Sequence, residues 1–211
     1  MIALVDYGAG NLTSVRKALS ALGAGHFTPA APEELLQASA IIVPGVGHFD
    51  ATAALDDGWR RMVRDLCHGE RVPLLGICLG MQWLFEGSDE AAHLPGLGYF
   101  PGRCTRLPGD DRTRVKVPHV GWNTLEIASD SPLLRDVHDG DQVYFTHAYA
   151  APMTADGVAA TTHGARFAAA VGAKNVMGVQ FHPEKSGDVG LRILRNFLEV
   201  ARDPLGTTHI T

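Results

Sequence analysis

The chain has 211 residues, 45% of them hydrophobic and 19% charged, with a formal net charge of −5 at pH 7. This balance is ordinary for a globular protein, and an acidic chain without a basic stripe gives no reason to expect nucleic acid. The N-terminus lacks the basic segment of a signal peptide, and no run approaches the ~18 apolar residues of a membrane span. The cysteines Cys67, Cys78 and Cys104 are odd in number and widely spaced. Such usage favours a cytoplasmic protein over a disulfide framework.

The first half of the chain alternates short apolar runs with helical patterns. This alternation predicts the α/β class, with a mostly parallel central sheet covered by helices on both faces. Ligands of such folds bind at the carboxyl ends of the strands. The predicted strands are 2–5, 40–43 and 72–75, and the predicted helices are 12–22, capped by Asn11, 32–36 and 59–66.

After Glu86 the pattern changes to short β-type segments separated by proline and glycine. They predict a smaller antiparallel β segment in the second half. A buried strand at 175–181 and a final helix with Asp188 as its cap complete the pattern. We expect one domain over residues 1–202 and a loose C-terminal tail over 203–211. The β-type segments lie near 104–107, 113–117, 124–127, 142–149, 158–162 and 167–171.

The stretch Gly-Ile-Cys-Leu-Gly-Met-Gln at 76–82 joins the third predicted strand to a helical pattern. A strained strand-to-helix turn of the form Gly-x-nucleophile-x-Gly exposes its central residue, and its glycines avoid clashes. A thiolate at this position, Cys78, would be favoured by the positive end of the helix dipole. The alternative is a small cysteine buried in a core strand.

A cysteine nucleophile needs a base, and His182 is the best placed histidine because it ends a predicted strand. Glu184 lies two residues on and points the same way in an extended chain, which Pro183 favours at the preceding residue. The carboxylate could then hold the imidazole tautomer. A histidine–carboxylate pair on the surface is the alternative. His-x-Glu also occurs in zinc deaminases, but no cysteine follows Cys104, so we expect no metal and no cofactor.

Two glycine-rich turns follow predicted strands. The turn Pro-Gly-Val-Gly at 44–47 exposes backbone N–H groups that can bind an oxyanion, although it could also be an ordinary strand–helix turn. The loop with Gly8, Gly10 and Thr13 lacks the third glycine of a dinucleotide fingerprint. A non-catalytic nucleotide-binding module is therefore the alternative function of a different class.

The motif at 76–82, together with His-Pro-Glu at 182–184, resembles the class I (triad) glutamine amidotransferase family over nearly the whole chain. Further stretches resemble one subfamily, the glutaminase subunits of imidazole glycerol phosphate synthase in histidine biosynthesis. Anthranilate synthase and pyridoxal phosphate synthase glutaminases share the triad without this combination. Another cysteine hydrolase, or the glutaminase of a different amidotransferase, is the alternative. The stretches are Asp-Tyr-Gly-Ala-Gly-Asn at 6–11, Pro-Gly-Val-Gly-His-Phe at 44–49, Pro-His-Val-Gly-Trp-Asn at 118–123, Tyr-Phe-Thr-His-Ala-Tyr at 144–149 and Gln-Phe-His-Pro-Glu-Lys-Ser-Gly at 180–187.

The resemblance implies a role for each matching residue. Cys78 attacks the side-chain amide of glutamine, His182 acts as base and then protonates ammonia, and Glu184 orients His182. One position departs from the family, because Ala148 stands where serine or threonine is common. The implied oxyanion donors are Val46, Gly47 and Leu79, and the implied substrate-binding residues are Gly45, Gln82, Glu90, His147, Ala148 and Tyr149.

The resemblance also implies a partner, the cyclase subunit of imidazole glycerol phosphate synthase. That subunit is a (β/α)₈ barrel, and the two chains form a heterodimer. Direct transfer is needed because free ammonia in water is largely protonated and no longer nucleophilic. The residues implied to lie near the interface are Asn11, Trp122, Tyr144 and Lys185.

Overall fold

The computed structural model describes residues 1–10, 12–68, 72–109 and 115–202. The predicted cap Asn11, part of the predicted segment 113–117 and the predicted tail 203–211 lie outside these ranges. None of the helices in the described ranges has the length and apolar character needed to cross a membrane.

Eight strands of the described residues form one sheet, in the order β2-β1-β3-β4-β13-β12-β11-β8. The first five run parallel to one another, and the last three continue the sheet in antiparallel fashion. This arrangement confirms the predicted α/β class. The bounds are β2 (His26–Phe27), β1 (Ile2–Leu4), β3 (Ala40–Gly45), β4 (Leu74–Cys78), β13 (Val176–Val179), β12 (Ala165–Ala173), β11 (Gly157–His163) and β8 (Glu126–Ile127).

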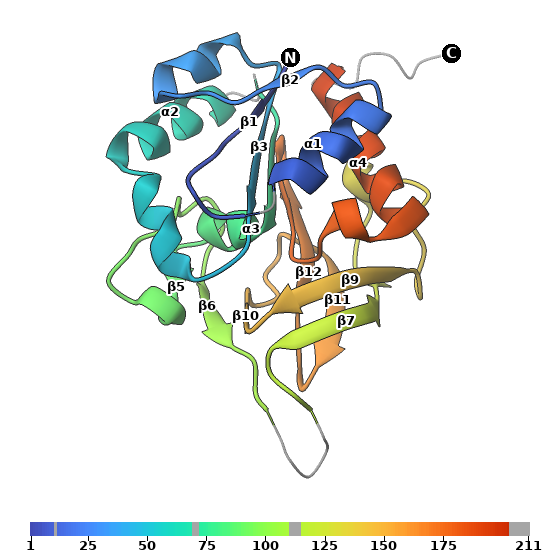
Figure 1. Cartoon of the computed structure of the whole chain (residues 1–211). Helices are drawn as coiled ribbons and strands as arrows, with labels where there is room; N and C mark the ends of the chain where they lie inside the picture. Colours follow the sequence, from blue (N-terminus) through green and yellow to red (C-terminus); the bar gives the residue numbers. More distant parts are fainter. Residues whose placement is uncertain (11, 69–71, 110–114, 203–211) are drawn as a thin grey trace.

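Helices cover both faces of this sheet (Figure 1). On one face α1 (Leu12–Ala21) and α4 (Gly187–Arg202) pack into one hydrophobic core, and on the other α2 (Asp57–Cys67) and α3 (Leu79–Leu84) pack into a second. Burial on two sides explains why the parallel strands are continuous apolar runs rather than alternating ones. The 3₁₀ turns are η1 (Pro32–Gln37), η2 (Phe49–Ala54), η3 (Asp89–Ala91), η4 (Pro132–Leu134) and η5 (Pro183–Lys185).

Two small sheets complete the fold. β7 (His119–Thr124) pairs antiparallel with β9 (Gln142–His147), and the pair lies crosswise beneath α1 and α4 (Figure 1). After Ala148 the chain continues as β10 (Tyr149–Ala150), which pairs with β6 (Arg103–Arg106), and β6 pairs in turn with β5 (Gly87–Ser88). The segment β9–β10 therefore joins both small sheets.

Three sequence predictions of local structure are wrong. The predicted strand 142–149 is divided at Ala148 into β9 and β10, which belong to different sheets. The predicted strand 124–127 is divided, because β7 already occupies 119–124 and only Glu126–Ile127 forms β8. The burial of β7 alternates along the whole strand, but Gly121 at its centre has no β-type side chain, which hides the strand from a search for β-type residues. Asp188 is not a helix cap, because α4 begins at Gly187 and places Asp188 in its first turn.

Candidate active site

The elbow predicted from the sequence is present between β4 and α3. Cys78 ends β4 with φ of 53°, in a region that residues other than glycine rarely adopt. A Cβ atom at Gly76 would lie 2.7 Å from the carbonyl oxygen of Gly80, and one at Gly80 would overlap the carbonyl oxygen of Val43. Both glycines are therefore required for α3 to turn back closely onto β4 and β3.

Replacing Gly80 with alanine is expected to destabilise the protein, at the upper end of the about 1–3 kcal/mol typical of overpacking. The new methyl group would meet backbone rather than a movable side chain, so α3 must shift away from β3. The measurement is urea unfolding followed by circular dichroism. Gly25→Ala is the matched control, since its Cβ would make only a 3.7 Å contact with Met1 Cγ. Equal unfolding free energies for the two variants would contradict the steric argument.

A histidine and a carboxylate lie beside the elbow. β13 runs parallel to β4, with Val179 opposite Ile77, so Cys78 and His182 both emerge at the carboxyl edge of the sheet. The Nδ1 atom of His182 lies 2.8 Å from Oε1 of Glu184, and both side chains are 2% exposed. This burial rules out the alternative of a surface ion pair.

The electrostatics of His182 favour its charged form. Burial alone would lower the pKa of His182, but the Cys78 thiolate and then Glu184 more than offset it and raise this pKa to about 10. The Nε2 atom forms no hydrogen bond of good geometry with the described residues, although Cys78 is near enough to act electrostatically.

The glycine-rich turn 44–47 also emerges at this edge. Gly45 lies opposite Cys78 in the parallel pairing of β3 and β4. A Cβ atom at Gly45 would overlap the hydroxyl of the buried Tyr7, so only glycine fits there. Gly47 has φ of 110° and lies against the elbow. Two of the three expected oxyanion residues, Gly47 and Leu79, thus line the cavity at Cys78, and Gly45, expected to bind substrate, lies opposite Cys78 in the sheet.

A cavity of about 30 Å³ opens at Cys78. This volume suits a water molecule or two rather than a glutamine side chain, so substrate entry requires its walls to move apart. The walls include five of the six expected substrate-binding residues, and they do not include Gly45 or Val46. Thr146 also lines the cavity and was not predicted. The lining residues are Gly47, Cys78, Leu79, Gln82, Glu90, Thr146, His147, Ala148 and Tyr149.

Two glutamines connect the cavity wall to the thiol of Cys78. The side-chain nitrogen of Gln82 donates to the carbonyl oxygen of Tyr149 at 2.9 Å and to Oε1 of Gln180 at 3.2 Å. The side-chain nitrogen of Gln180 in turn approaches Sγ of Cys78 at 3.5 Å. Gln180 was missed by the sequence analysis. Its signal was available, because it precedes His182 by two residues on an extended segment and so faces the same way.

Two further hydrogen-bonded side chains hold loops of the site. An oxygen of Glu90 accepts the N–H of Phe49 at 2.9 Å, which ties η3 to the segment after the glycine-rich turn. Ser186 Oγ donates to the carbonyl of His182 at 2.6 Å and accepts the N–H of Tyr144 at 2.9 Å. The N–H of His182 donates back to the carbonyl of Tyr144 at 2.9 Å. We call these three bonds the serine knot; Ser186 also was not predicted.

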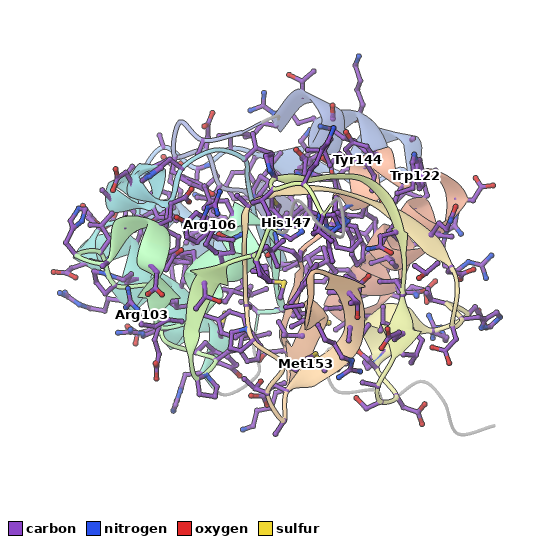
Figure 2. The ribbon with its side chains drawn as sticks, turned by 90° about the horizontal axis from the view of Figure 1, so that it is seen from below. Arg103, Arg106, Trp122, Tyr144, His147 and Met153 are labelled. Carbon is purple, nitrogen blue, oxygen red and sulfur yellow. The ribbon has the colours of Figure 1, made fainter. Side chains whose placement is uncertain are left out.

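Three of the four expected interface residues lie together at the surface. Trp122 on β7 is 54% exposed, and its ring meets that of Tyr144 on β9 edge-on at 6.1 Å between centroids. Lys185 Nζ lies 5.9 Å from the centroid of the Tyr144 ring. Figure 2 shows Trp122 and Tyr144 on one rim, with His147 nearer the middle of the molecule. The fourth, Asn11, lies outside the described residues.

The other thiols and the metal-binding side chains offer no competing site in the described ranges. Cys67 and Cys104 are unpaired and buried. Burial raises the pKa of the Cys67 thiol to about 12 and raises that of Cys104 as well, so both stay protonated at neutral pH. Within residues 1–10, 12–68, 72–109 and 115–202, no three side chains of histidine, cysteine or acidic type are grouped for a metal ion.

Comparisons with known proteins agree with this geometry. The family model "Glutamine amidotransferase class-I" matches residues 3–201. The protein "Imidazole glycerol phosphate synthase subunit HisH" of Halalkalibacterium halodurans is 48% identical over 204 residues, covering 93% of this chain and 94% of that protein. The proteins of the same name from Bacillus subtilis and Archaeoglobus fulgidus are 44% and 43% identical and cover 98% and 100% of their own lengths, and 96% of this chain in each case.

Solved structures share the fold at low sequence identity. A chain described as "Crystal structure of glutamine amidotransferase" superposes with a TM-score of 0.74 at 21% identity, covering 96% of this chain and 100% of its own. The "Structure of PurLQS from Thermotoga maritima" gives a TM-score of 0.70 at 17% identity, covering 94% of this chain and 97% of its own.

Proposed function

The chain belongs to the class-I glutamine amidotransferase family, and from this membership we propose that it is the glutaminase subunit of an imidazole glycerol phosphate synthase. It hydrolyses glutamine to glutamate and ammonia and delivers the ammonia for use in histidine biosynthesis. The observation that carries the proposal is the near full-length match, at 43–48% identity, to subunits of that name. The glutaminase domain comprises residues 1–202, followed by a tail at 203–211.

The first half of the reaction forms a thioester. The thiolate of Cys78 attacks the side-chain amide carbon of glutamine, and a tetrahedral oxyanion forms. As the carbon–nitrogen bond breaks, the imidazolium of His182 gives its proton to the departing nitrogen, and ammonia leaves. The raised pKa of His182 supports this role, because the proton needed by the leaving group is already in place.

The second half hydrolyses the thioester. His182, now neutral, takes a proton from a water molecule that attacks the thioester carbon. Collapse of the second tetrahedral intermediate expels the Cys78 thiolate and releases glutamate, while His182 is again an imidazolium. The buried carboxylate of Glu184, 2.8 Å from Nδ1 of His182, supports a fixed ring orientation in both halves.

Backbone N–H groups stabilise the oxyanion in both intermediates. Leu79 follows the nucleophile directly, and Val46 or Gly47 supplies the second donor. Gln82 and Glu90 bind the amino-acid end of the substrate, together with backbone groups of Gly45 and residues 147–149. Ala148 has no hydroxyl to offer, so its contact is through the backbone.

The ammonia passes to a cyclase subunit bound as a heterodimer partner. Ammonia released into water would be protonated, which favours direct transfer over diffusion. Trp122, Tyr144 and Lys185 contact this partner, as does Asn11. The clustering of three of them on one exposed rim supports the assignment. The enzyme acts in the cytoplasm, which the three unpaired cysteines support, and uses neither a cofactor nor nucleic acid.

The test is glutamate release from glutamine by the isolated chain, by the chain with its cyclase subunit, and by the pair with a ligand of the cyclase site. Weak hydrolysis is expected from the isolated chain, because its cavity of about 30 Å³ does not admit glutamine without rearrangement. A strong rise is expected with the liganded partner. Coupled ammonia transfer is measured in parallel, as cyclase product formed with glutamine as the only nitrogen source.

Two results would refute the proposal. One is full glutaminase activity in the isolated chain that does not change when the partner is added. This result would show that glutamine hydrolysis is not coupled to the cyclase. The other is hydrolysis of peptides or esters with glutamine inert even beside the cyclase, which would identify a different cysteine hydrolase on the same elbow.

A further inference from the structure

Two buried histidines, His147 in the cavity wall and His119 next to it, are not used as acid or base in the proposed reaction. We propose that His119 and Asn123 are positioning residues, which act through the ring of His147 on the Tyr149 carbonyl and so on Gln82. We call Asn123, His119 and His147 the histidine relay. The inference rests on the proposed function, since it assigns the relay to glutamine binding.

The direction of each hydrogen bond in the relay follows from the bond between His147 and the carbonyl of Tyr149. The carbonyl of Tyr149 can only accept, so the Nδ1 atom of His147, 2.9 Å away, must carry a proton. In a neutral ring Nε2 is then an acceptor. Nδ1 of His119 lies 3.2 Å from this Nε2 and must therefore donate to it.

At the other end of the relay, the hydrogen bonds of Asn123 require Nε2 of His119 to be an acceptor, which agrees with a proton on Nδ1 of that ring. The Oδ1 atom of Asn123 accepts the N–H of Thr124 at 2.9 Å, and its Nδ2 atom donates to the carbonyl of Thr162 at 3.0 Å. The second proton of Nδ2 is left for Nε2 of His119, at 3.3 Å. Every nitrogen of both rings thus has one assigned partner, and no proton has to be shared.

Burial keeps both rings neutral, as this pattern requires. His119 is 4% exposed and His147 is 7% exposed. Burial, and then the neighbouring His163, lowers the pKa of His119 to about 4, and burial lowers that of His147 to about 3. The rings of His163 and Phe145 stack on His119 at 4.0 and 4.7 Å between centroids, and neither side chain takes part in the hydrogen bonds of the relay.

The relay ends on an atom that the glutamine site also uses. The Tyr149 carbonyl accepts from His147 and from Gln82, both at 2.9 Å, and Gln82 continues through Gln180 to Cys78. Loss of the His119 donor leaves a buried acceptor on His147 unpaired, so the ring and the Tyr149 carbonyl must readjust. The cavity wall moves, while Cys78, His182 and Glu184 keep their own contacts. The relay should therefore affect glutamine binding more than chemistry.

The experiment compares four proteins in complex with the cyclase subunit: wild type, His119→Phe, His119→Asn and His163→Gln. Phenylalanine keeps the ring stacking but removes both nitrogens, whereas asparagine restores a donor near the position of Nδ1. We expect His119→Phe to raise KM for glutamine about tenfold with little change in kcat. His119→Asn should return KM to within about twofold of wild type. His163→Gln, which loses stacking but leaves the relay, should match wild type.

An equal rise in KM for both His119 variants would overturn the inference, because it would mean a packing role alone. An unchanged KM in His119→Phe would overturn it too. If His119→Phe does not fold, Asn123→Leu decides the question, with an expected rise in KM of about threefold. Ammonia-dependent synthesis by each complex should stay at the wild-type rate.

A second readout needs no activity. The ¹⁵N chemical shifts of the imidazoles in the wild-type chain should show both His119 and His147 protonated on Nδ1, and a proton on Nε2 of either ring would overturn the relay. This separates the two proposals: wrong tautomers, or the wrong KM pattern, refute the relay and leave the glutaminase intact. A wild-type complex that does not release glutamate from glutamine refutes the proposed function instead.

Discussion

Changing Cys78 to alanine is expected to lower glutamine-dependent synthesis by the complex at least about 10⁴-fold, as removal of a triad nucleophile does in hydrolases. No other thiol can substitute, because burial keeps Cys67 and Cys104 protonated and away from the cavity. Synthesis supplied with an ammonium salt should continue at the wild-type rate, since the cyclase then obtains its ammonia from solution. Product formation with each nitrogen source, measured in the same preparation, checks both expectations.

The matched control for this variant is Cys67→Ala, which removes another buried and unpaired cysteine. It should retain glutamine-dependent synthesis. Normal glutamate release by Cys78→Ala would show that the nucleophile lies elsewhere. Loss of ammonia-dependent synthesis together with the glutaminase would instead show that the variant no longer forms the complex.

The substitution Glu184→Gln is expected to lower kcat for glutamine hydrolysis about 10³–10⁴-fold, a loss similar to that known for the orienting acid of other triads. The carboxylate is nearly fully buried and accepts from Nδ1 of His182. Glutamine at this position can offer its own N–H to Nδ1, which reverses the tautomer, and it carries no charge to support the imidazolium. The pKa of His182 therefore falls. Single-turnover kinetics separate this chemical defect from binding.

Glu126→Gln is the control, because it neutralises an exposed carboxylate that pairs with Arg166 at 3.1 Å, outside the cavity walls. Its activity should be unchanged. The rate at which iodoacetamide alkylates Cys78 is an independent measurement. This rate should fall in Glu184→Gln, because the Cys78 thiolate loses its charged partner. A wild-type kcat in this variant would mean that Glu184 serves only the fold.

The sequence was sufficient for the features fixed by local geometry. The elbow could be predicted because Gly76 and Gly80 leave no room for a side chain on either side of Cys78. The positions of His182 and Glu184 followed from a strand end and an i, i+2 spacing. The parallel sheet followed from the alternation of apolar runs and helical stripes. For the elbow and the His182–Glu184 pair the information lies in neighbouring residues, and for the sheet it lies in the order of such local patterns along the chain.

Features that depend on contacts between distant segments were not predictable. Gln180 acquires its role only because Gln82, far away in the chain, lies beside it. His119 and His147 meet only because β7 pairs with β9. The predicted cap Asp188 is wrong because the carbonyl of Ser186 accepts the N–H of Gly190, so α4 begins at Gly187, two residues earlier than a cap at Asp188 would place it.

The serine knot has a consequence for the dynamics of His182, the base of the proposed reaction. Two of the knot's three hydrogen bonds hold the backbone C=O and N–H of His182, and the third joins Ser186 to the N–H of Tyr144. The backbone of His182 can move away from β9 only when these bonds open together, which is a local unfolding event with its own free energy. The amide protons of Tyr144 and His182 should therefore exchange with solvent at the same slow rate. The position of His182 in the site therefore depends on the free energy of local unfolding of this segment.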